Sequence, residues 1–424
     1  MCNTQKSFLF CFILCILCVF CVAQNDINSP YSSFGVGNLS PRTNVVSTSM
    51  GGVGYALQNP YYINFKNSAA FAAFDSLSFI ADLSFDLVSH QLRTTTQQQS
   101  GTFAQLGYLA IGLPVLPVWR TSVGIMPFSD VGYGIVSESQ KEHFEKVTNR
   151  YTGSGGLQLL YWGNAFKVCK GFTLGANLSY LFGTINTTRI AEYDEMDHAF
   201  NTITSDFRYL DGIYISGGAQ YQATVKEKHH IGIGVVYENA IKVWSRENVT
   251  TFSYRDNMID TVEMSIGKDA IRSFVTMPHI VGGGLSYGYK DQLLVAADFT
   301  WQNWKRFSMS RSKDTLLNSF IAAIGMQYVP DPVSSKYYNK INFRIGTRFA
   351  SGYMMINQKP ISEFAVSVGL GFPIRTFNTR SSINIMFEYS KLGTLQNNLI
   401  LQNYFKLSVN FILQERWYQR RKLN

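Results

Sequence analysis

Strict alternation of apolar and polar residues is the feature that most restricts how this chain can fold. In residues 77–87 every second residue from Leu77 is apolar, and the positions between them include Asp82 and Asp86. Successive side chains of an extended strand point to opposite faces, so this segment predicts a strand with one apolar and one polar face. Strong or weaker alternation recurs in residues 103–113, 118–128, 157–166, 172–182, 209–221, 231–237, 279–289, 293–301, 320–328, 341–349, 364–372, 383–389 and 401–411.

The links between these segments alternate in length. A transmembrane β-barrel has short turns at its periplasmic end and longer loops at the cell surface, whereas a soluble β-sandwich or propeller, the alternative, has no reason to sort its loops. We therefore predict an all-β protein, a closed antiparallel transmembrane barrel of about 14 strands. The short turns are residues 114–117, 169–171, 226–230, 290–292, 330–336 and 375–380, and the longer, more polar links are residues 90–102, 129–156, 183–207, 238–278, 303–317, 351–362 and 391–398.

Residues 249–254 form either one more strand or the tip of a hairpin within the outer link 238–278. Closure of the barrel with an even number of strands favours the second interpretation.

Composition supports a membrane barrel. Charged residues make up 15% of the chain, against roughly 25% in soluble domains. Beyond the amino terminus no segment approaches the run of about 18 apolar residues that marks a spanning helix, which excludes a helical bundle. The net charge of +9 is partly carried by residues 416–422, and no motif indicates a nucleic-acid partner.

Residues 1–23 have the composition of a secretory signal peptide. Lys6 supplies the basic start, residues 8–22 are almost wholly apolar, and Cys21 and Ala23 offer the small residues that a signal peptidase reads. A transmembrane helix is the alternative, but the apolar run of about 15 residues is shorter than the roughly 20 that a spanning helix needs. Cleavage here removes five of the six cysteines and leaves only Cys169, so no internal disulfide can form. We expect export to the outer membrane of a Gram-negative cell.

Residues 24–76 differ from the alternating segments of the chain. Residues 48–74 are rich in Gly, Ala, Ser and Asn, contain the cluster Gly51-Gly52-Val53-Gly54, and show no sustained alternation. We expect residues 24–76 to lie as a plug inside a barrel formed by residues 77–413, with residues 414–424 as a basic C-terminal tail.

Ionisable residues on the polar faces of the strands would line the lumen. Closure makes the first and last strands neighbours and brings Asp82 and Asp86 towards Lys406. One interpretation is a lattice of ion pairs that holds the plug, because buried charges persist when they are paired. The other is that Arg344, Arg348 or Lys406 receives the carboxylate of a ligand. The predicted lumen charges are Asp82, Asp86, Asp298, Arg344, Arg348, Glu388 and Lys406.

Pro127 interrupts the alternating segment that begins at residue 118. Proline cannot donate a ladder hydrogen bond, and a closed barrel has no edge where that loss would be harmless. The residue predicts either a kink or local gap in the wall, or simply the end of the strand where the outer loop begins.

No arrangement of residues indicates an enzyme. The six histidines are scattered over turns and loops without the spacing of a metal site, and the glycine cluster at 51–54 is not followed by a helix within a βαβ unit. Residues 192–197 are expected to be a solvated acidic loop, with cation binding as the alternative. We predict no catalytic residue, no metal and no cofactor.

Three segments of the chain, at residues 29–74, 122–133 and 410–424, resemble the FadL-like outer-membrane transporters of long-chain fatty acids and aromatic hydrocarbons, in the branch found in Bacteroidetes. The resemblance covers the whole mature chain and implies a barrel of about 14 strands with an N-terminal plug. It also implies a kink in the third strand that opens a lateral exit. Apolar substrates would enter from outside, bind in the lumen and leave sideways into the bilayer after the plug shifts. The segments read SPYSSFGVGNLSPRTNVVSTSMGGVGYALQNPYYINFKNSAAFAAF, SVGIMPFSDVGY and NFILQERWYQRRKLN.

The resemblance carries over to single residues at two places. Asn67 and Ala69 match the family's Asn-Pro-Ala signature in the plug, with serine in place of the proline. Pro127 and Phe128 match its Pro-Phe-Gly at the kink, with Ser129 in place of the glycine. We accordingly assign a lateral gate to Pro127, Phe128 and Ser129, and plug or ligand contacts to Met50, Gly51, Gly52, Asn64, Phe65, Asn67 and Ala69.

Three functions remain as hypotheses. The first is a porin-like channel for passive uptake of hydrophobic small molecules, fatty acids or similar, with lateral release into outer-membrane lipid. The second is a barrel that serves as a partner or attachment component of a type IX-like protein secretion system, without transport of its own. The third, an outer-membrane hydrolase, is disfavoured because no Ser, His and acid constellation occurs on any strand pair.

Overall fold

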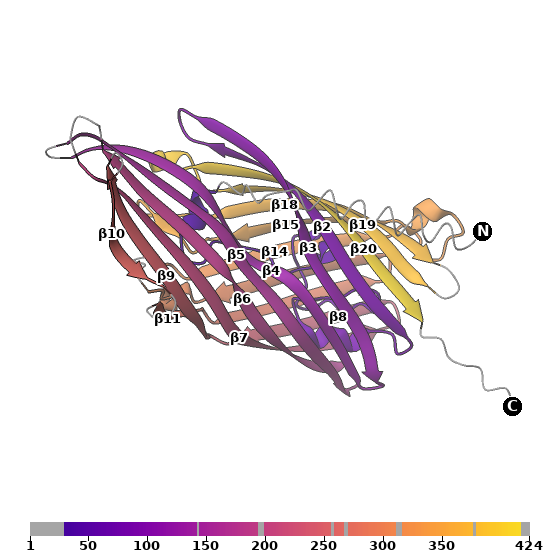
Figure 1. The fold of residues 1–424 in the computed structure, drawn as a ribbon. Coiled ribbons are helices and arrows are strands. Elements are labelled where there is room, and N and C mark those ends of the chain that lie inside the picture. The colour runs from indigo at the N-terminus through magenta and orange to yellow at the C-terminus, as the bar shows by residue number, and fades with distance from the viewer. Residues whose placement is uncertain are drawn as a thin grey trace, which may run out of the picture.

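Fourteen antiparallel strands close into a barrel (Figure 1). The computed structural model describes residues 29–141, 144–193, 199–255, 258–266, 270–310, 316–375 and 379–416. Each strand pairs with the next over at least part of its length, and the last pairs with the first. The strands therefore form a closed ring. The ring consists of β2 (Ser78–Arg93), β3 (Gln98–Leu116), β4 (Trp119–Lys141), β5 (Phe144–Cys169), β6 (Phe172–Tyr193), β7 (Asn201–Val225), β8 (His229–Glu238), β12 (Ile280–Tyr289), β13 (Leu293–Gln302), β14 (Ser319–Tyr328), β15 (Asn342–Ala350), β18 (Glu363–Arg375), β19 (Arg380–Leu392) and β20 (Leu401–Arg416).

Each segment predicted from alternation overlaps one strand of the ring, so the predicted fold class is confirmed. The alternation arises because the apolar face points outward. On β8, for example, Ile231, Ile233, Val235 and Tyr237 are exposed, while Val236 between them is buried. Such an outward apolar face suits lipid, and the polar inward face suits a lumen. The barrel thus has the architecture of an outer-membrane protein.

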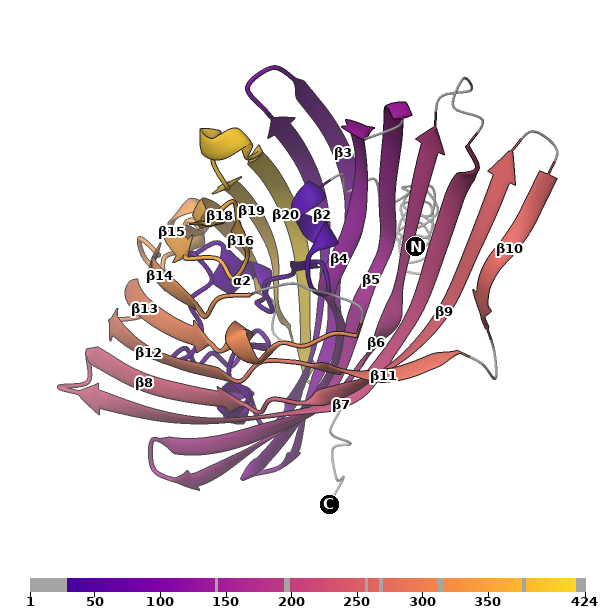
Figure 2. The same cartoon turned by 90° about the vertical axis from the view of Figure 1, so that its left-hand side faces the viewer.

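One side of the barrel is much taller than the other (Figure 2). Strands β4 to β7 contain 22 to 26 residues each, whereas β8 and β12 to β15 contain nine or ten. About 9–11 residues are enough for a tilted strand to span the bilayer. The additional residues of the tall side therefore project beyond the membrane, at the end opposite the short turns.

The tall side corrects the expectation that residues 129–156 and 183–207 are loops. Both ranges are largely strand, and β4 and β5 stay paired from Trp119 to Lys141. Their sequences are rich in Thr, Ser and Asn, so both faces of these strand parts are polar. A strand that faces water on both sides loses the alternation that reveals it, although its ladder persists. The acidic loop predicted at 192–197 lies mostly outside the described residues.

A strand hairpin extends the tall side further. The favoured interpretation of residues 249–254 as a loop tip is wrong, because they belong to β9 (Lys242–Arg255), which pairs with β10 (Met258–Ser265) and β11 (Ile271–Thr276). β9 also pairs with the upper half of β7, above the part of β7 that pairs with β8. The hairpin therefore adds strands above the ring without changing the even number of strands within it.

Residues 29–77 run inside the barrel and contain only short elements (Figure 2). These are η1 (Pro30–Ser33), β1 (Asn38–Leu39), α2 (Val45–Thr48) and η2 (Ser68–Ala73). The remaining short elements, in the outer loops and turns, are η5 (Trp304–Arg306), η6 (Tyr337–Lys340), β16 (Met355–Ile356), β17 (Lys359–Pro360) and η7 (Gln396–Asn398). Within the described ranges, no helix combines the length and apolar character needed to cross a membrane.

We call residues 29–77 the N-terminal segment. Two of its helical turns are capped by asparagine: the Asn44 side chain accepts a hydrogen bond from Ser47 N at 2.6 Å, and that of Asn67 accepts one from Ala69 N at 3.1 Å. The predicted boundaries at residues 76 and 413 stay predictions, although β2 begins at Ser78 and β20 runs on to Arg416. The predicted signal peptide and most of the tail lie outside the described residues.

Glycines in the wall let the N-terminal segment approach closely. A Cβ atom built on Gly346 would collide with backbone atoms of Met50 and Gly51, and one on Gly325 would collide with the Met50 carbonyl. A glycine places no side chain in the way of a neighbouring backbone, so segment and wall can touch directly. Met50 is buried in this contact, with 1% of its surface exposed.

Replacing Gly346 by valine should force the N-terminal segment off the wall. We expect Gly346→Val to destabilise the packed segment by about 1–3 kcal/mol, as overpacking does in other interiors, and to make it accessible to protease. Limited proteolysis with mass spectrometry of the fragments checks this. Gly283→Val is the matched control, because a Cβ there meets nothing closer than 3.7 Å. Equal protease resistance of the two variants would contradict the contact.

Candidate functional site

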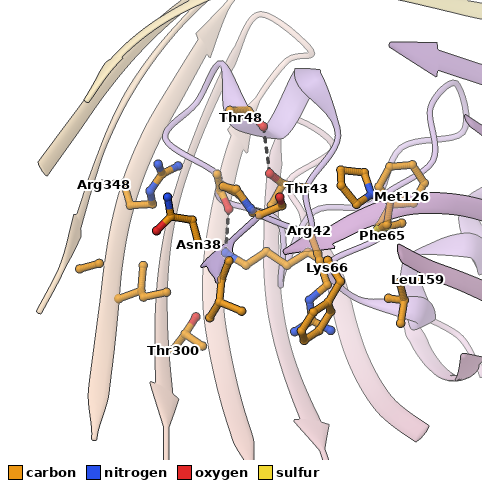
Figure 3. Close-up of a pocket in the computed structure, with 18 of the residues that line it drawn as sticks. Asn38, Arg42, Thr43, Thr48, Phe65, Lys66, Met126, Leu159, Thr300 and Arg348 are labelled. Carbon is orange, nitrogen blue, oxygen red and sulfur yellow. Dashed lines mark hydrogen bonds between the residues drawn. The ribbon is translucent and has the colours of Figure 1, made fainter. Parts of the chain in front are cut away.

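A cavity of about 410 Å³ lies in the lumen between the N-terminal segment and the wall. Its apolar part includes Phe65, Met126 and Leu159, and its polar part includes Arg348 and Thr300 (Figure 3). Phe65 from the segment packs edge-on against Tyr108 and Tyr161 of the wall, with ring centres 4.8 and 5.7 Å apart. The cavity is therefore apolar towards β3, β4 and β5 and polar towards β13 and β15.

Loops at the end of the barrel opposite the short turns cover the cavity. An apolar cluster joins these loops to the start of the N-terminal segment, and within it the rings of Trp304 and Tyr353 stack at 4.6 Å. Both rings also line the cavity. The other buried members of this cluster are Tyr31, Leu316, Met354, Ile361 and Leu399.

The predicted plug residues divide into two groups. Gly52 and Phe65 line the cavity, and the Gly52 carbonyl accepts a hydrogen bond from Lys66 Nζ at 2.7 Å. The others are buried contacts that fold or anchor the N-terminal segment. Gly51 N donates to Ser367 Oγ of β18 at 2.9 Å, and the remaining members, Met50, Asn64, Asn67 and Ala69, are at most 2% exposed.

The two asparagines of this group illustrate the folding role. Asn64 Nδ2 donates to the Gly54 and Leu57 carbonyls at 2.7 and 2.9 Å, and Asn67 Nδ2 donates to the Tyr55 carbonyl at 2.8 Å. Both amides thus satisfy backbone groups of a segment that has no regular ladder of its own. In this structure they shape the segment and do not line the cavity.

Several of the predicted lumen charges form ion pairs. Lys406 Nζ lies 2.7 Å from Asp86 Oδ2, and Arg348 contacts Glu363 at 2.8 Å and Glu388 at 3.3 Å. Asp298 reaches the N-terminal segment, where it pairs with Lys66 Nζ at 3.0 Å and accepts hydrogen bonds from two backbone amides of the glycine-rich turn. Lys66, which the sequence reasoning overlooked, therefore ties the segment to the wall.

Asp82 and Arg344 are joined by a relay of amides. Arg344 Nη1 donates to Asn384 Oδ1 at 2.8 Å, Asn384 Nδ2 donates to Asn410 Oδ1 at 2.9 Å, and Asn410 Nδ2 donates to Asp82 Oδ1 at 2.7 Å. Asp82 was expected near Lys406, but the strand register places Asp82 opposite Ile412, several residues further along β20. Arg348 and Lys406 line the cavity, whereas Arg344 is buried outside its lining.

The wall is interrupted beside the apolar part of the cavity. The ladder between β3 and β4 ends with the pair Leu109 and Ile125, although both strands continue. Two residues later the β4–β5 ladder shifts register between Pro127 and Ser129, which leaves Phe128 as an extra residue on β4. Such a bulge bends a strand, and proline supplies no ladder donor there. Pro127 and Phe128 line the cavity and lie at this irregularity of the third ring strand, and their role as a gate stays a prediction.

The N-terminal segment takes up the freed edge of β4. Asn38 and Leu39 of β1 pair with Asp130 and Ser129. On either side of this short ladder, Ser40 N donates to the Phe128 carbonyl at 3.0 Å, and Ser29 N donates to the Gly132 carbonyl at 2.8 Å. A two-residue strand gives no alternation signal, so the sequence could not reveal it.

Arg42 connects this covered edge to β7 and β8 of the wall. Its Nη2 lies 2.7 Å from Glu238 Oε2, and its guanidinium stands 5.6 Å from the ring centres of both Phe128 and Tyr214. Cation–π contacts of this kind add to the ion pair. The bulged residue of β4 is thereby held by the N-terminal segment. A single Arg in a Gly- and Ser-rich stretch was the only sequence signal for it.

Solved structures share this fold at low sequence identity. The toluene transporter TodX of Pseudomonas putida has a TM-score of 0.59 and 15% identity, covering 90% of this chain and 100% of that one. The toluene transporter TbuX of Ralstonia pickettii has a TM-score of 0.57 and 15% identity, covering 89% and 100%. A FadL homologue of Pseudomonas aeruginosa has a TM-score of 0.58 and 11% identity, covering 90% and 100%. The FadL-like fold expected from the sequence is confirmed.

The assignment to a Bacteroidetes branch stays a prediction.

No curated protein sequence matches the chain. A family model described as BamG matches residues 5–424, nearly the full length, and the chain therefore belongs to the BamG family.

Proposed function

We propose that this protein is an outer-membrane channel through which uncharged hydrophobic molecules leave the lumen sideways into the membrane. The observation that carries the proposal is the end of the β3–β4 ladder at Ile125, next to the apolar part of the cavity. TodX and TbuX, which share the fold, are described as toluene transporters. An apolar solute gains roughly 0.8 kcal/mol for each CH₂ group it removes from water, so direct passage into lipid is favoured over release into the periplasm.

The charges around the cavity favour a neutral ligand over a fatty acid. Arg42, Arg348 and Lys406 line it, and each is within 2.8 Å of a carboxylate. A ligand carboxylate would have to displace one of these partners, and a buried acid left without its cation is costly. A toluene-like molecule can occupy the space beside Phe65 and Met126 without breaking any pair.

In this proposal the first residues of the N-terminal segment act as the gate. They cover the edge of β4 through the two-residue ladder of β1, the backbone hydrogen bonds of Ser29 and Ser40, and the side-chain hydrogen bonds of Ser32 and Ser129. A hydrogen bond of this kind contributes only about 0.5–1.5 kcal/mol net, so the cover can detach without unfolding the barrel. Release of Phe128 from Arg42 would accompany the detachment.

A disulfide across the β1–β4 ladder should close the channel reversibly. In a Cys169→Ser background, the pair Asn38→Cys and Asp130→Cys occupies directly opposed positions, where a disulfide can form. We expect oxidation to abolish uptake of radiolabelled toluene by cells carrying the protein, and reduction to restore it. The single variant Asn38→Cys is the control. Undiminished uptake by fully oxidised protein would rule out lateral exit at this edge.

Loss of Arg42 should loosen the gate. If Arg42→Ala removes about 1.4 kcal/mol of stabilisation, the open population rises roughly tenfold, and toluene uptake at low substrate concentration should rise with it. Arg306→Ala removes the same charge from an exposed position at the end of η5 and serves as the control. The measurement is toluene uptake by cells that contain equal amounts of each variant. If both variants behave as the unaltered protein does, Arg42 has no part in gating.

A second candidate function is a partner in a larger outer-membrane protein assembly, such as a secretion system. The tall side favours it, since strands of 22 to 26 residues exceed what crossing a bilayer requires and offer a large surface beyond it. Native mass spectrometry after gentle extraction from the protein's own membrane tests this. We expect a stoichiometric second protein, and a preparation holding only small apolar molecules would remove this candidate.

A further inference from the structure

The tall side is an open sheet with two edges, although the ring beneath it is closed. Its strands pair in the order β4, β5, β6, β7, β9 and β10. The β4 edge is partly covered by β1. At the other end, β10 pairs with β9, and no second strand pairs with it among the described residues. Figure 2 shows β10 as the outermost strand of this side.

The β10 edge lies well beyond the membrane. The part of β9 that pairs with β10 also pairs with residues 201–206 of β7. The ring strand β8 ends lower on β7, opposite Ser216. Ten residues of tilted strand separate these levels, which corresponds to roughly 25 Å along the barrel axis. Contact with lipid tails therefore does not account for the apolar residues that β10 exposes.

β10 has only part of the protection that a sheet edge normally carries. Natural edges are protected by charged residues, above all lysine, by proline, by β-bulges or by a covering loop. The β9–β10 register shifts between Thr261 and Glu263, and residues 258–265, which read MIDTVEMS, include two acids but neither lysine nor proline. Their large apolar side chains are strongly exposed: Ile259 at 74%, Val262 at 63%, Met264 at 62% and Met258 at 52%. Exposed apolar side chains on an open edge are the combination that strand addition uses.

We propose that β10 is a docking site for an extended segment of another polypeptide exposed at the cell surface, which adds a strand to the tall side. Backbone hydrogen bonds would supply affinity, and the apolar side chains of β10 would contact alternate residues of the added strand. Because β10 carries Asp260 and Glu263, the added segment should combine apolar residues with lysine or arginine. A second copy of β10 fits less well, since it would bring like charges together.

This site would give the second candidate function a location, and it rests on that candidate rather than on transport. A photoreactive phenylalanine analogue at position 259 or 264, in the full chain in its native outer membrane, provides the test. We expect crosslinks to a second protein that map to an extended apolar and basic segment. Ile259→Lys should weaken crosslinking from position 264 roughly tenfold, because it repels such a segment and removes its apolar contact.

Val136→Lys is the matched control, since Val136 is 59% exposed on β4 of the same tall side. It should leave the crosslinks unchanged. Crosslinks to a second copy of this chain, crosslinks to lipid alone, or equal effects of the two lysine variants would each overturn the site. If a partner still co-purifies with Ile259→Lys in native mass spectrometry, the assembly stands and only its place on β10 is wrong. If no partner co-purifies with the unaltered protein, the second candidate function itself fails.

Discussion

Pairing of backbone N–H and C=O groups is the constraint on which the structure depends. In lipid these groups have no water to bond, so the sheet must close, and β2 pairs with β20 along sixteen residues. Beside the cavity, the β3–β4 ladder stops at Ile125 although both of its strands continue. There the protein's own N-terminal segment supplies partners for β4. Closure and its local failure thus fix both the barrel and the candidate gate.

The lumen results from the same closure. A ring whose apolar face points outward must turn polar residues inward, and these need partners once the N-terminal segment excludes water. The segment meets the need with Lys66 at Asp298 and Arg42 at Glu238, while the wall pairs Lys406 with Asp86 within itself. Breaking such a buried pair is costly. The charges therefore hold the segment in one position. Its first residues lie on β4 through hydrogen bonds, each of which contributes less than a buried ion pair.

Features that repeat along the chain could be predicted, and features that occur once could not. Alternation gave all the ring strands, and closure correctly brought Asp86 to Lys406. Pro127 marked the irregular strand because its missing donor matters in any ladder. The upper parts of β4 to β7 were mistaken for loops, since water on both faces removes the alternation. The two-residue β1, the Arg42 contacts and the amide relay between Arg344 and Asp82 depend on register and on contacts far apart in sequence, which no local pattern records.

The two edges of the tall side differ in what can occupy them. β1 belongs to the same chain as β4, so its local concentration is high and fixed, of the order of millimolar for a short tether. A detached β1 would therefore return without a separate molecule, as the proposed gate requires. The β10 edge can be covered only by a separate molecule. Its occupancy therefore depends on the concentration and the affinity of that molecule. Since β4 and β10 bound one hydrogen-bonded sheet, transport and assembly would use opposite edges and need not compete for the same surface.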